Sequence, residues 1–396
     1  MTFRTLDAAE AGGKRALVRV DFNVPMTDGE VSDDTRLRAA LPTIARLRAA
    51  GAKVILISHF DRPKGKRVPS MSLRPVVAPL TELTGTSVNF AEDCVGETAA
   101  AAVASMNPGD VLLLQNLRFH AGEEANDPLF AQALAVNGDL FVDDAFSAAH
   151  RAHASTEALA HLLPAYAGEA MARELAALEA ALEHPRHPVL GVVGGSKVST
   201  KLDLLHNLIL KLDSLAIGGG MANTFLFAQG WEVGASYCEK ELADVARGLM
   251  AFALKHECVL LLPVDIVVAE RAAPGAQARS RALGEMDEDE RILDAGPRTI
   301  ARLAAAMDQA RTLVWNGPLG VFETPPFDKG TTAAARHAAS LCREGRLTAV
   351  AGGGDTVAAL NHAGVAQDFT FVSTAGGAFL EWMEGKTLPG VAALQV

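Results

Sequence analysis

Short, continuously apolar runs recur along the chain, each entered from a turn and followed by a segment of helical composition. The N-terminal half contains the runs Arg15–Val20, Lys53–Ser58, Thr86–Phe90, Asp110–Gln115 and Asp139–Val142. The C-terminal half contains Pro188–Val193, Ser214–Ile217, Cys258–Val264, Arg311–Trp315, Leu347–Ala351 and Thr370–Ser373. Runs that are apolar throughout, without alternation, are typical of parallel strands covered on both faces. With helical segments such as Asp34–Ala50 and Lys329–Glu344 between them, they predict βαβ units in two open α/β sheets.

The segment Gly168–His184 separates the two sets of runs. Its apolar residues Met171, Leu175, Leu178 and Leu182 recur at helical spacing, and prolines stop the helix soon after. The 396 residues exceed the ~100–200 that are usual for one domain. We therefore predict an α/β protein with two Rossmann-like, parallel-sheet domains, residues 1–170 and 171–379, joined by a hinge helix over residues 168–184.

The composition excludes several kinds of protein. There are 36 Lys and Arg against 47 Asp and Glu, a net charge of −11, and no basic tail, which argues against a nucleic-acid partner. The four cysteines are far apart in the sequence, so neither a disulfide framework nor a zinc site is expected. The N-terminus has no signal-peptide pattern, and no apolar stretch reaches the ~18–20 residues of a membrane span. We expect a cytoplasmic protein with no membrane partner.

Polar side chains follow the apolar runs of the N-terminal half. Ligands of open α/β sheets bind beyond the carboxyl ends of the strands, so these side chains are expected at one edge of the sheet. They are Asp21, Asn23, His59, Arg62, Asn116 and Arg118, with Arg36 in the next loop or first helical turn and His150, Arg151 and His153 after the fourth strong run. Because arginine donates two parallel hydrogen bonds and stays charged, the cluster predicts a binding face for a small polyanion.

The runs of the C-terminal half end in glycine-rich segments instead. They are Gly194-Gly195-Ser196-Lys197, Gly218-Gly219-Gly220, Asn316–Gly320, Gly352–Thr356 and Gly376-Gly377. Glycine lets backbone N–H groups approach a ligand, and a following helix N-terminus favours phosphate, so five such exits predict a nucleotide site. Neither a P-loop nor a dinucleotide fingerprint is present, since Ser196 and Val198 break the first motif. Lys197 and Lys201 are expected four residues apart on one face of a helix, within reach of a common anion.

Several distinctive segments resemble the phosphoglycerate kinase family, in the family's order and over essentially the whole chain. They are Arg19–Pro25 (RVDFNVP), Ser58–Pro63 (SHFDRP), Asn116–Phe119 (NLRF), Phe141–Ser155 (FVDDAFSAAHRAHAS), Gly194–Lys201 (GGSKVSTK), Asn316–Glu323 (NGPLGVFE), Gly352–Thr356 (GGGDT) and Ser373–Leu394 (STAGGAFLEWMEGKTLPGVAAL). The resemblance implies reversible phosphoryl transfer between 1,3-bisphosphoglycerate and ADP, giving 3-phosphoglycerate and ATP with Mg²⁺. It also implies that the tail, about residues 380–396, packs back on the N-terminal domain.

The resemblance assigns roles residue by residue. The phosphoglycerate ligands it implies are Asp21, Asn23, Arg36, His59, Arg62, Arg118 and Arg151. The nucleotide ligands are Lys201, Gly218, Gly219, Asn316, Glu323, Gly353, Gly354, Asp355 and Thr356, with Glu323 on the ribose and Asp355 on Mg²⁺. Arg36, Lys197 and Gly353 are expected to be catalytic. The chain departs from the family pattern at Asp61, where glycine is usual, at Asp143, where asparagine is usual, at Ser147, and at Ala375.

The chemistry needs no general base, because a carboxylate and a nucleotide phosphate are already ionised. It needs two aligned anions and cations that neutralise the transferring phosphoryl group, for which Arg36 and Lys197 are the candidates. If the two anions bind to separate domains, the domains must close to exclude water. We expect a monomer. An NAD-dependent two-domain dehydrogenase and a non-catalytic anion-binding clamshell protein are the alternatives, although the first should carry a dinucleotide fingerprint and the second an export signal.

Overall fold

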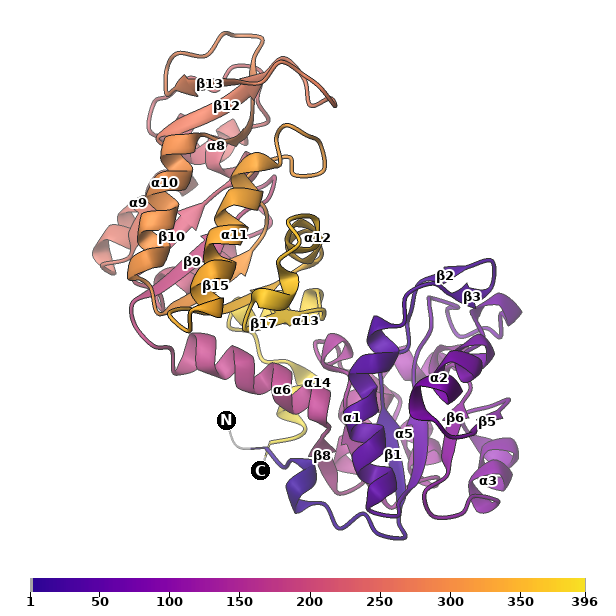
Figure 1. The fold of residues 1–396 in the computed structure, drawn as a ribbon. Coiled ribbons are helices and arrows are strands. Elements are labelled where there is room, and N and C mark those ends of the chain that lie inside the picture. The colour runs from indigo at the N-terminus through magenta and orange to yellow at the C-terminus, as the bar shows by residue number, and fades with distance from the viewer. Residues whose placement is uncertain (1–2, 396) are drawn as a thin grey trace. The chain divides into compact units, whose positions relative to one another are not determined.

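The computed structural model describes residues 3–395, and the chain divides into two folding units (Figure 1). Unit 1 comprises residues 1–175 and 387–396, and unit 2 comprises residues 176–386. Each unit is built around one six-stranded parallel sheet with helices on both faces.

The sheet of unit 1 has the strand order β5-β6-β4-β1-β7-β8. The strands are β1 (Arg15–Arg19), β4 (Lys53–Ile57), β5 (Val88–Ala91), β6 (Val111–Leu114), β7 (Leu140–Asp143) and β8 (Ala165–Ala167). The helices are α1 (Thr35–Ala49) and α2 (Val77–Thr84) in one apolar core and α3 (Gly96–Ala104) and α5 (Pro128–Ala135) in the other. Along β1, Val18 belongs to the first core and Leu17 to the second, so both faces of the strand are buried, as its unbroken apolar run predicts.

The sheet of unit 2 has the strand order β11-β10-β9-β15-β16-β17. The strands are β9 (Val189–Val193), β10 (Ser214–Ile217), β11 (Val259–Leu261), β15 (Thr312–Asn316), β16 (Thr348–Gly352) and β17 (Phe371–Ser373). The helices are α7 (Leu202–Ile209), α8 (Gly219–Ala228), α9 (Ala243–Lys255), α10 (Pro297–Gln309), α11 (Lys329–Arg343), α12 (Gly354–His362) and α13 (Gly377–Met383). Numbered along the chain, this order is third, second, first, fourth, fifth, sixth, which is the order of doubly wound nucleotide-binding sheets.

The predicted fold class is confirmed, but three β elements were not predicted. They are β8, the hairpin β2 (Met26–Thr27) with β3 (Glu30–Val31), and an antiparallel sheet of β13 (Arg279–Ala282), β12 (Asp265–Ala269) and β14 (Arg291–Ala295). The predicted strand Cys258–Val264 is shortened to β11 because the chain then turns into β12. The strand β13, with the sequence RSRA, is at least partly exposed along its whole length, so no apolar run marks it.

The predicted connecting helix is present as α6 (Glu169–Leu178), extended by a π-helical turn over Glu179–Glu183. Its first turn is held by Asp144, whose carboxylate accepts hydrogen bonds from the backbone N–H groups of Ala170 and Met171 at 2.8 and 3.1 Å. The boundary between the two units falls inside this helix. Hinge motion there stays a prediction.

The short last helix, α14 (Pro389–Ala392), belongs to unit 1. The backbone N–H of Gly390 donates a hydrogen bond to the carbonyl oxygen of Ala149 at 2.9 Å, and Phe3 bridges to Gln395. The ends of the described chain therefore lie together in this unit, whereas α13 belongs to unit 2.

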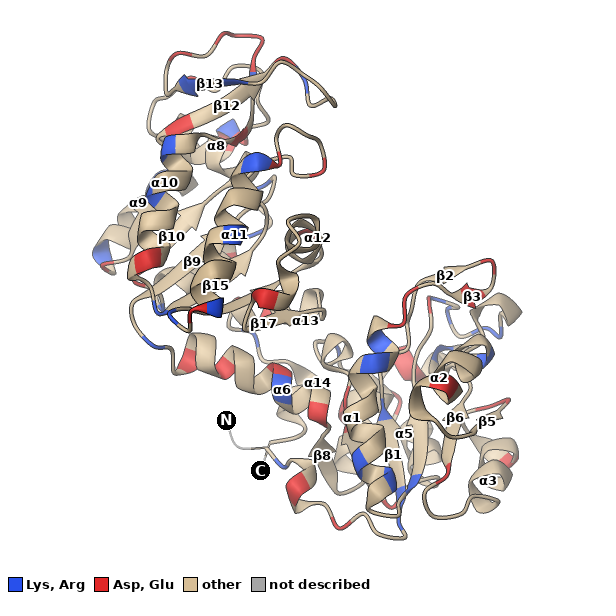
Figure 2. Ribbon diagram, in the orientation of Figure 1, with Lys and Arg blue, Asp and Glu red and all other residues tan. Residues whose placement is uncertain are grey.

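Acidic and basic residues alternate along the ribbons of both units (Figure 2), so the net negative charge leaves room for local basic clusters. Among residues 3–395, no helix combines the length and the apolar character that a membrane crossing needs.

Candidate functional site

In each sheet there is one pair of neighbouring strands from which the chain continues to opposite sides of the sheet, and the polar segments of the sequence lie at that point. In unit 1 this point lies between β1 and β7, which pair in parallel; in unit 2 it lies between β9 and β15. The chain leaves the carboxyl ends of these neighbouring strands in opposite directions, which opens a crevice in which ligands of such folds bind.

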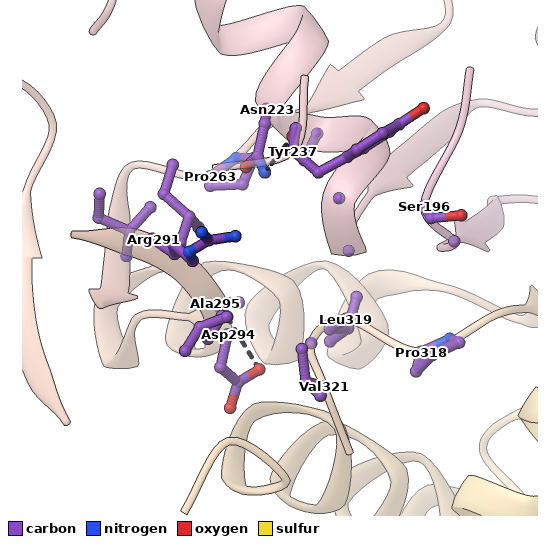
Figure 3. A pocket seen from close by; sticks show the side chains of 18 of the residues that line it. Ser196, Asn223, Tyr237, Pro263, Arg291, Asp294, Ala295, Pro318, Leu319 and Val321 are labelled. Carbon is purple, nitrogen blue, oxygen red and sulfur yellow. Dashed lines mark hydrogen bonds between the residues drawn. The ribbon is translucent and has the colours of Figure 1, made fainter. Parts of the chain in front are cut away.

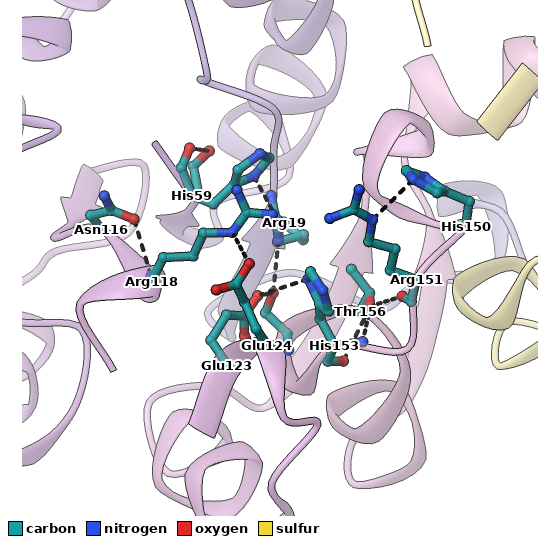
Figure 4. Close-up of polar contacts among 12 residues, drawn as sticks. Arg19, His59, Asn116, Arg118, Glu123, Glu124, His150, Arg151, His153 and Thr156 are labelled. Atoms are coloured by element: carbon teal, nitrogen blue, oxygen red, sulfur yellow. Dashed lines mark hydrogen bonds and ion pairs between the residues drawn. The ribbon is translucent and has the colours of Figure 1, made fainter. Parts of the chain in front are cut away.

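In unit 1 the crevice is a small cavity of about 160 Å³, here called the anion cavity. Its lining residues are Asn23, His59, Asp61, Arg62, Arg118, Ser147, Ala148, His150, Arg151 and His153. Five of the seven predicted phosphoglycerate ligands are therefore brought together here from four separate loops. Figure 4 shows the side chains of His59, Arg118, Arg151 and His153 around this region.

Asp21 and Arg36, the other two predicted ligands, lie beside the cavity and do not line it. Arg36, in the first turn of α1, donates hydrogen bonds to a carboxylate oxygen of Asp21 at 3.1 Å and to the carbonyl oxygen of Asn23 at 2.8 Å. Asp21 also accepts a hydrogen bond from the Ser147 hydroxyl at 2.5 Å. Ser147, a departure from the family pattern, thus helps to hold the Asp21 carboxylate in place.

The backbone geometry at Asp61 explains why glycine is usual in this position. Asp61 has φ +53°, in the left-handed region that favours glycine and that aspartate tolerates better than most residues. Its carboxylate accepts a hydrogen bond from the backbone N–H of Arg62 at 2.9 Å, and its carbonyl oxygen accepts one from the Arg118 guanidinium at 2.8 Å. Asp61 is exposed and lines the anion cavity, and within residues 3–395 its carboxylate forms no ion pair with the arginines there.

The arginines of the anion cavity are charged, whereas His59 and His153 are held neutral by their surroundings. Burial and the nearby guanidinium groups of Arg19 and Arg118 hold the pKa of His59 well below its usual range. The same effects lower the pKa of His153 to about 4. Both imidazoles are therefore neutral at neutral pH, and Arg62, Arg118 and Arg151 supply the charge that attracts an anion.

A buried network that sequence reasoning missed lies behind this cavity. Arg19, in β1, is fully buried, and its Nε donates to the hydroxyl of Ser155 at 2.8 Å. The Ser155 hydroxyl donates in turn to Glu123 at 2.6 Å, while the backbone N–H of Ser155 donates to the other Glu123 oxygen at 3.0 Å. The signal for it in the sequence is Arg19, a charged residue inside an otherwise apolar run, but the run alone does not indicate its partners Ser155 and Glu123.

In unit 2 the crevice is a larger pocket of about 340 Å³, here called the glycine-lined pocket (Figure 3). Its lining residues are Gly195, Ser196, Gly219, Gly220, Ala222, Asn223, Tyr237, Pro263, Ile266, Arg291, Ile292, Leu293, Asp294, Ala295, Pro318, Leu319, Gly320, Val321, Glu323 and Asp355. Gly219, Glu323 and Asp355 were predicted. Asn223, Tyr237 and Arg291 were not predicted from the sequence. They come from α8, a loop and the antiparallel sheet, and none of them directly follows a parallel strand.

Two glycines have geometries that other residues would not adopt. Gly219 opens α8 with φ +66°, and a Cβ there would lie 2.7 Å from the carbonyl oxygen of Gly195. Gly353 has φ +97° at the N-cap of α12, and a Cβ there would lie 2.6 Å from the amide nitrogen of Asn316. Both positions bring backbone N–H groups of a helix start close to the crevice, where an anion is favoured.

The expected lysine pair is wrong, because Lys197 and Lys201 do not share a helix face. The helix α7 begins only at Leu202, and residues 194–201 form loop and turns. Lys201 turns inward, and its ammonium donates to the carbonyl oxygen of Gly194 and to Oδ1 of Asn316, both at 2.6 Å. Burial lowers the pKa of Lys201 to about 8. Lys197 is exposed on the loop, with no hydrogen bond or ion pair from its ammonium among the described residues.

The loop that carries Lys197 is anchored by a residue absent from the predicted site. The carboxylate of Glu239, itself buried, accepts hydrogen bonds from the backbone N–H groups of Val198 at 2.6 Å and Ser199 at 3.1 Å. It also accepts the hydroxyl hydrogen bond of Ser199. These bonds hold the pKa of Glu239 below its usual value and keep the loop in one conformation against α8.

The remaining predicted nucleotide residues surround the pocket without lining it. Asn316 donates from Nδ2 to the carbonyl oxygen of Gly352 at 2.7 Å, and the Thr356 hydroxyl accepts from the N–H of Gly317 at 2.7 Å. Gly354 is the first residue of α12, and Gly218 is the N-cap of α8. These bonds tie the end of β15 to the start of α12.

Asp355 fits the role of a Mg²⁺ ligand by the chemistry of its donor. It is an exposed carboxylate in the first turn of α12, at the margin of the glycine-lined pocket, and it forms no hydrogen bond or ion pair with the described residues. Mg²⁺ typically binds one or two carboxylates together with substrate phosphates and water, so a single free carboxylate beside an anion site suits it.

A second group of potential metal ligands, Asp93, Cys94 and His120 in unit 1, is satisfied internally. His120 and the Asp93 carboxylate are joined at 2.7 Å, and the Arg67 guanidinium donates to the other Asp93 oxygen at 3.0 Å. Burial raises the pKa of the Cys94 thiol well above its usual range, which disfavours the thiolate that binds metals. These contacts do not favour a cation there.

Comparison with known proteins decides the family. The family model described as "Phosphoglycerate kinase" matches residues 6–386. The chain belongs to the phosphoglycerate kinase family. It is 68% identical to the phosphoglycerate kinase of Caulobacter vibrioides over 395 residues, all of both chains, and 60% identical to that of Brucella abortus over 395 residues, again all of both chains. The solved phosphoglycerate kinase structure from Coxiella burnetii superposes with a TM-score of 0.93 at 41% identity, covering 99% of each chain.

Membership of the phosphoglycerate kinase family confirms the predicted class of enzyme, a kinase. A more distant structure, the phosphoglycerate kinase of Pyrococcus horikoshii, still matches 99% of this chain and 98% of its own at a TM-score of 0.79 and 30% identity. The agreement covers both units, so the dehydrogenase and the non-catalytic anion-binding protein are set aside.

Two departures from the family pattern have a structural reading. Ala375 is buried and is not among the residues with positive φ, so alanine adopts its backbone conformation without strain. Asp143 ends β7 fully buried; one carboxyl oxygen accepts from the N–H of Ala145 at 3.0 Å, and the other has no hydrogen-bond partner. Burial raises the pKa of Asp143 from 3.8 to about 7.

Asp143→Asn is expected to stabilise the protein above pH 7. Asp143 ionises near pH 3.8 in the unfolded chain and near pH 7 in the folded one, so its ionisation costs stability progressively as pH rises between these values. Asparagine does not ionise, and the gain should reach at most about 4 kcal/mol at pH 8 and vanish towards pH 4. Urea unfolding from pH 4 to 8 measures it; a gain independent of pH would contradict this reading.

Proposed function

We propose that this chain transfers a phosphoryl group reversibly between the acyl phosphate of 1,3-bisphosphoglycerate and ADP, giving 3-phosphoglycerate and ATP. The observation that carries the proposal is the grouping of Arg62, Arg118 and Arg151 around one small cavity in a member of this family. A permanently charged arginine cluster suits a small phosphorylated carboxylic acid, because each guanidinium can bind phosphate or carboxylate through two parallel hydrogen bonds.

In this proposal the acid binds in the anion cavity. Arg62, Arg118 and Arg151 hold its phosphate, while Asn23 and His59 donate neutral hydrogen bonds. Asp21 and Arg36 are joined to each other and to Asn23, so they hold the reacting end of the ligand as a unit. Nearly all of these groups are already hydrogen-bonded to neighbours, so little conformational entropy is lost on binding.

The nucleotide binds in the glycine-lined pocket. Leu293, Leu319 and Val321 offer apolar surface to the base, and Glu323 accepts hydrogen bonds from the ribose hydroxyls. The phosphates extend towards Lys201 and the start of α12, where Gly353, Gly354 and Thr356 present backbone N–H groups. This places the dipole of α12 and one ammonium at the phosphate chain.

Positioning and charge neutralisation then accomplish the transfer. The attacking oxygen is already ionised, so no side chain has to remove a proton. Arg36, Lys197 and the N–H groups at Gly353 are the donors that meet the charge on the transferring phosphoryl group. Mg²⁺, held by Asp355 and the nucleotide phosphates, supplies further positive charge when bound.

The proposal is tested by ATP consumption that depends on 3-phosphoglycerate, followed in a coupled assay with purified protein. Two variants divide the sites. Arg118→Ala should raise KM for 3-phosphoglycerate about 10-fold or more and leave KM for ATP nearly unchanged, whereas Glu323→Gln should do the reverse. Loss of a hydrogen bond to a charged group costs about 1.5–3 kcal/mol, and this free energy corresponds to the expected change in KM. A protein that consumes no ATP, or the opposite pattern of KM values, would refute the assignment.

Arg36→Ala and Lys197→Ala should lower kcat by roughly 10²–10³-fold, with smaller changes in KM, because their bonds strengthen only as charge develops on the transferring group. Single-turnover kinetics at saturating substrates measure the effect. Lys240→Ala, at the exposed lysine that follows Glu239 in the sequence, is the matched control and should remain as active as the unmodified protein. Near-normal turnover of either test variant would remove that residue from the transfer step.

The two anion sites belong to different folding units, so transfer requires the units to approach when both ligands are bound. We place this motion at the helix α6 and its π-helical turn. Small-angle scattering should show a smaller radius of gyration with 3-phosphoglycerate and a non-hydrolysable ATP analogue together than with neither. An unchanged radius would argue against closure. The same measurement reports the molecular mass in solution, which we expect to be that of a monomer. We also expect the protein to be in the cytoplasm.

A further inference from the structure

One ring nitrogen of His59 faces an arginine, and toward an arginine a ring nitrogen can act only as a hydrogen-bond acceptor. Nη2 of Arg19 lies 3.0 Å from Nδ1 of His59 (Figure 4). A guanidinium has five N–H donors and no acceptor, and it stays protonated at any working pH. Nδ1 must therefore be the bare, accepting nitrogen of the ring.

Arg19 itself is held in one position. It is fully buried; Nε donates to the Ser155 hydroxyl at 2.8 Å, and Nη1 donates to the carbonyl oxygen of Val20 at 2.5 Å. Ser155 passes the interaction on to the buried carboxylate of Glu123. Each of the three guanidinium nitrogens thus has its own acceptor, and the nitrogen aimed at His59 has little freedom to turn away.

We propose that Arg19 is a positioning residue for the anion cavity: it fixes His59 as the neutral tautomer whose proton lies on Nε2. Because His59 lines the cavity and Nδ1 is committed to Arg19, Nε2–H is the donor that the ring offers to a bound carboxylate or phosphate. This inference rests on the proposed use of the cavity for phosphoglycerate, but the tautomer itself can be measured without any ligand.

The charged surroundings of His59 agree with this assignment. Burial disfavours a second proton on the ring most, and the positive charges of Arg19 from β1, Arg118 from the turn after β6 and Arg36 from α1 add to this effect; His153, from the loop after β7, adds to it only when protonated. A protonated His59 would also place an N–H against the Arg19 donor. The ring should therefore remain a neutral donor through the range in which an ordinary histidine titrates.

The wild-type protein provides the first test. Long-range ¹H–¹⁵N spectra of imidazole-labelled protein between pH 5.5 and 8 distinguish a bare ring nitrogen from a protonated one, and His59→Gln identifies the signals. We expect one bare nitrogen, assigned to Nδ1, and one protonated nitrogen, Nε2, throughout. A proton on Nδ1, or on both nitrogens at pH 6.5, would overturn the proposal.

Substitution of Arg19 provides the second test. Arg19→Met removes the donor while keeping an unbranched side chain. The His59 signals should then show a mixture of tautomers, and the pKa of His59 should rise. KM for 3-phosphoglycerate should rise about 3- to 10-fold, which corresponds to the loss of about one hydrogen bond. KM for ATP should not change. Arg19→Lys, which keeps a charged donor, should restore the single tautomer in part. An unchanged tautomer in a folded Arg19→Met protein would refute the role.

The matched control is Arg48→Met, another arginine of unit 1, which donates to the carbonyl oxygens of Gly109 and Thr84 away from the cavity. It should leave the His59 spectrum and both KM values unchanged. If Arg19→Met does not fold, the wild-type spectrum still decides the tautomer. If the wild-type protein shows no phosphoglycerate-dependent activity, the proposed function is wrong, but the spectra still decide the tautomer of His59 independently.

Discussion

Burial of parallel strands on both faces is the constraint on which the rest of this structure depends. A strand such as β1 contributes alternate residues to two apolar cores, so neither face of the strand is open to solvent or ligand. Polar side chains that bind a ligand therefore lie at the end of the strand. Since all strands of each sheet run in one direction, those ends lie along one edge. Both candidate sites of the chain follow from this geometry, at the points where the strand order reverses.

The two candidate sites offer anions different kinds of donor in a protein with a net charge of −11. The anion cavity concentrates arginines, while burial and the nearby guanidinium groups lower the pKa of His59 and His153 so that these two rings are neutral at neutral pH. The glycine-lined pocket depends on backbone N–H groups and helix starts, with Lys201 turned inward beside them. A side-chain site suits a small rigid acid, and a backbone site suits a phosphate chain that must approach closely.

The departures from the family pattern show how local context decides what a residue does. Asp61 occupies a left-handed backbone position, where its carboxylate accepts a hydrogen bond from the backbone N–H of Arg62, and Ser147 adds a hydrogen bond to Asp21. Asp143 replaces a neutral amide in a fully buried place, where the cost of ionisation keeps it largely protonated below pH 7.

The sequence by itself determined the two parallel sheets, the connecting helix and most residues of the anion cavity, because apolar runs and the side chains that follow them are local patterns. Only the tertiary structure decided what those patterns could not express. Arg291 reaches the glycine-lined pocket from β14 of an antiparallel sheet, whose strand β13 has no apolar run. Lys197 and Lys201 do not share a helix face because α7 begins after them. Arg19, Ser155 and Glu123 meet only on folding, since burying a guanidinium requires acceptors that lie far apart in the sequence.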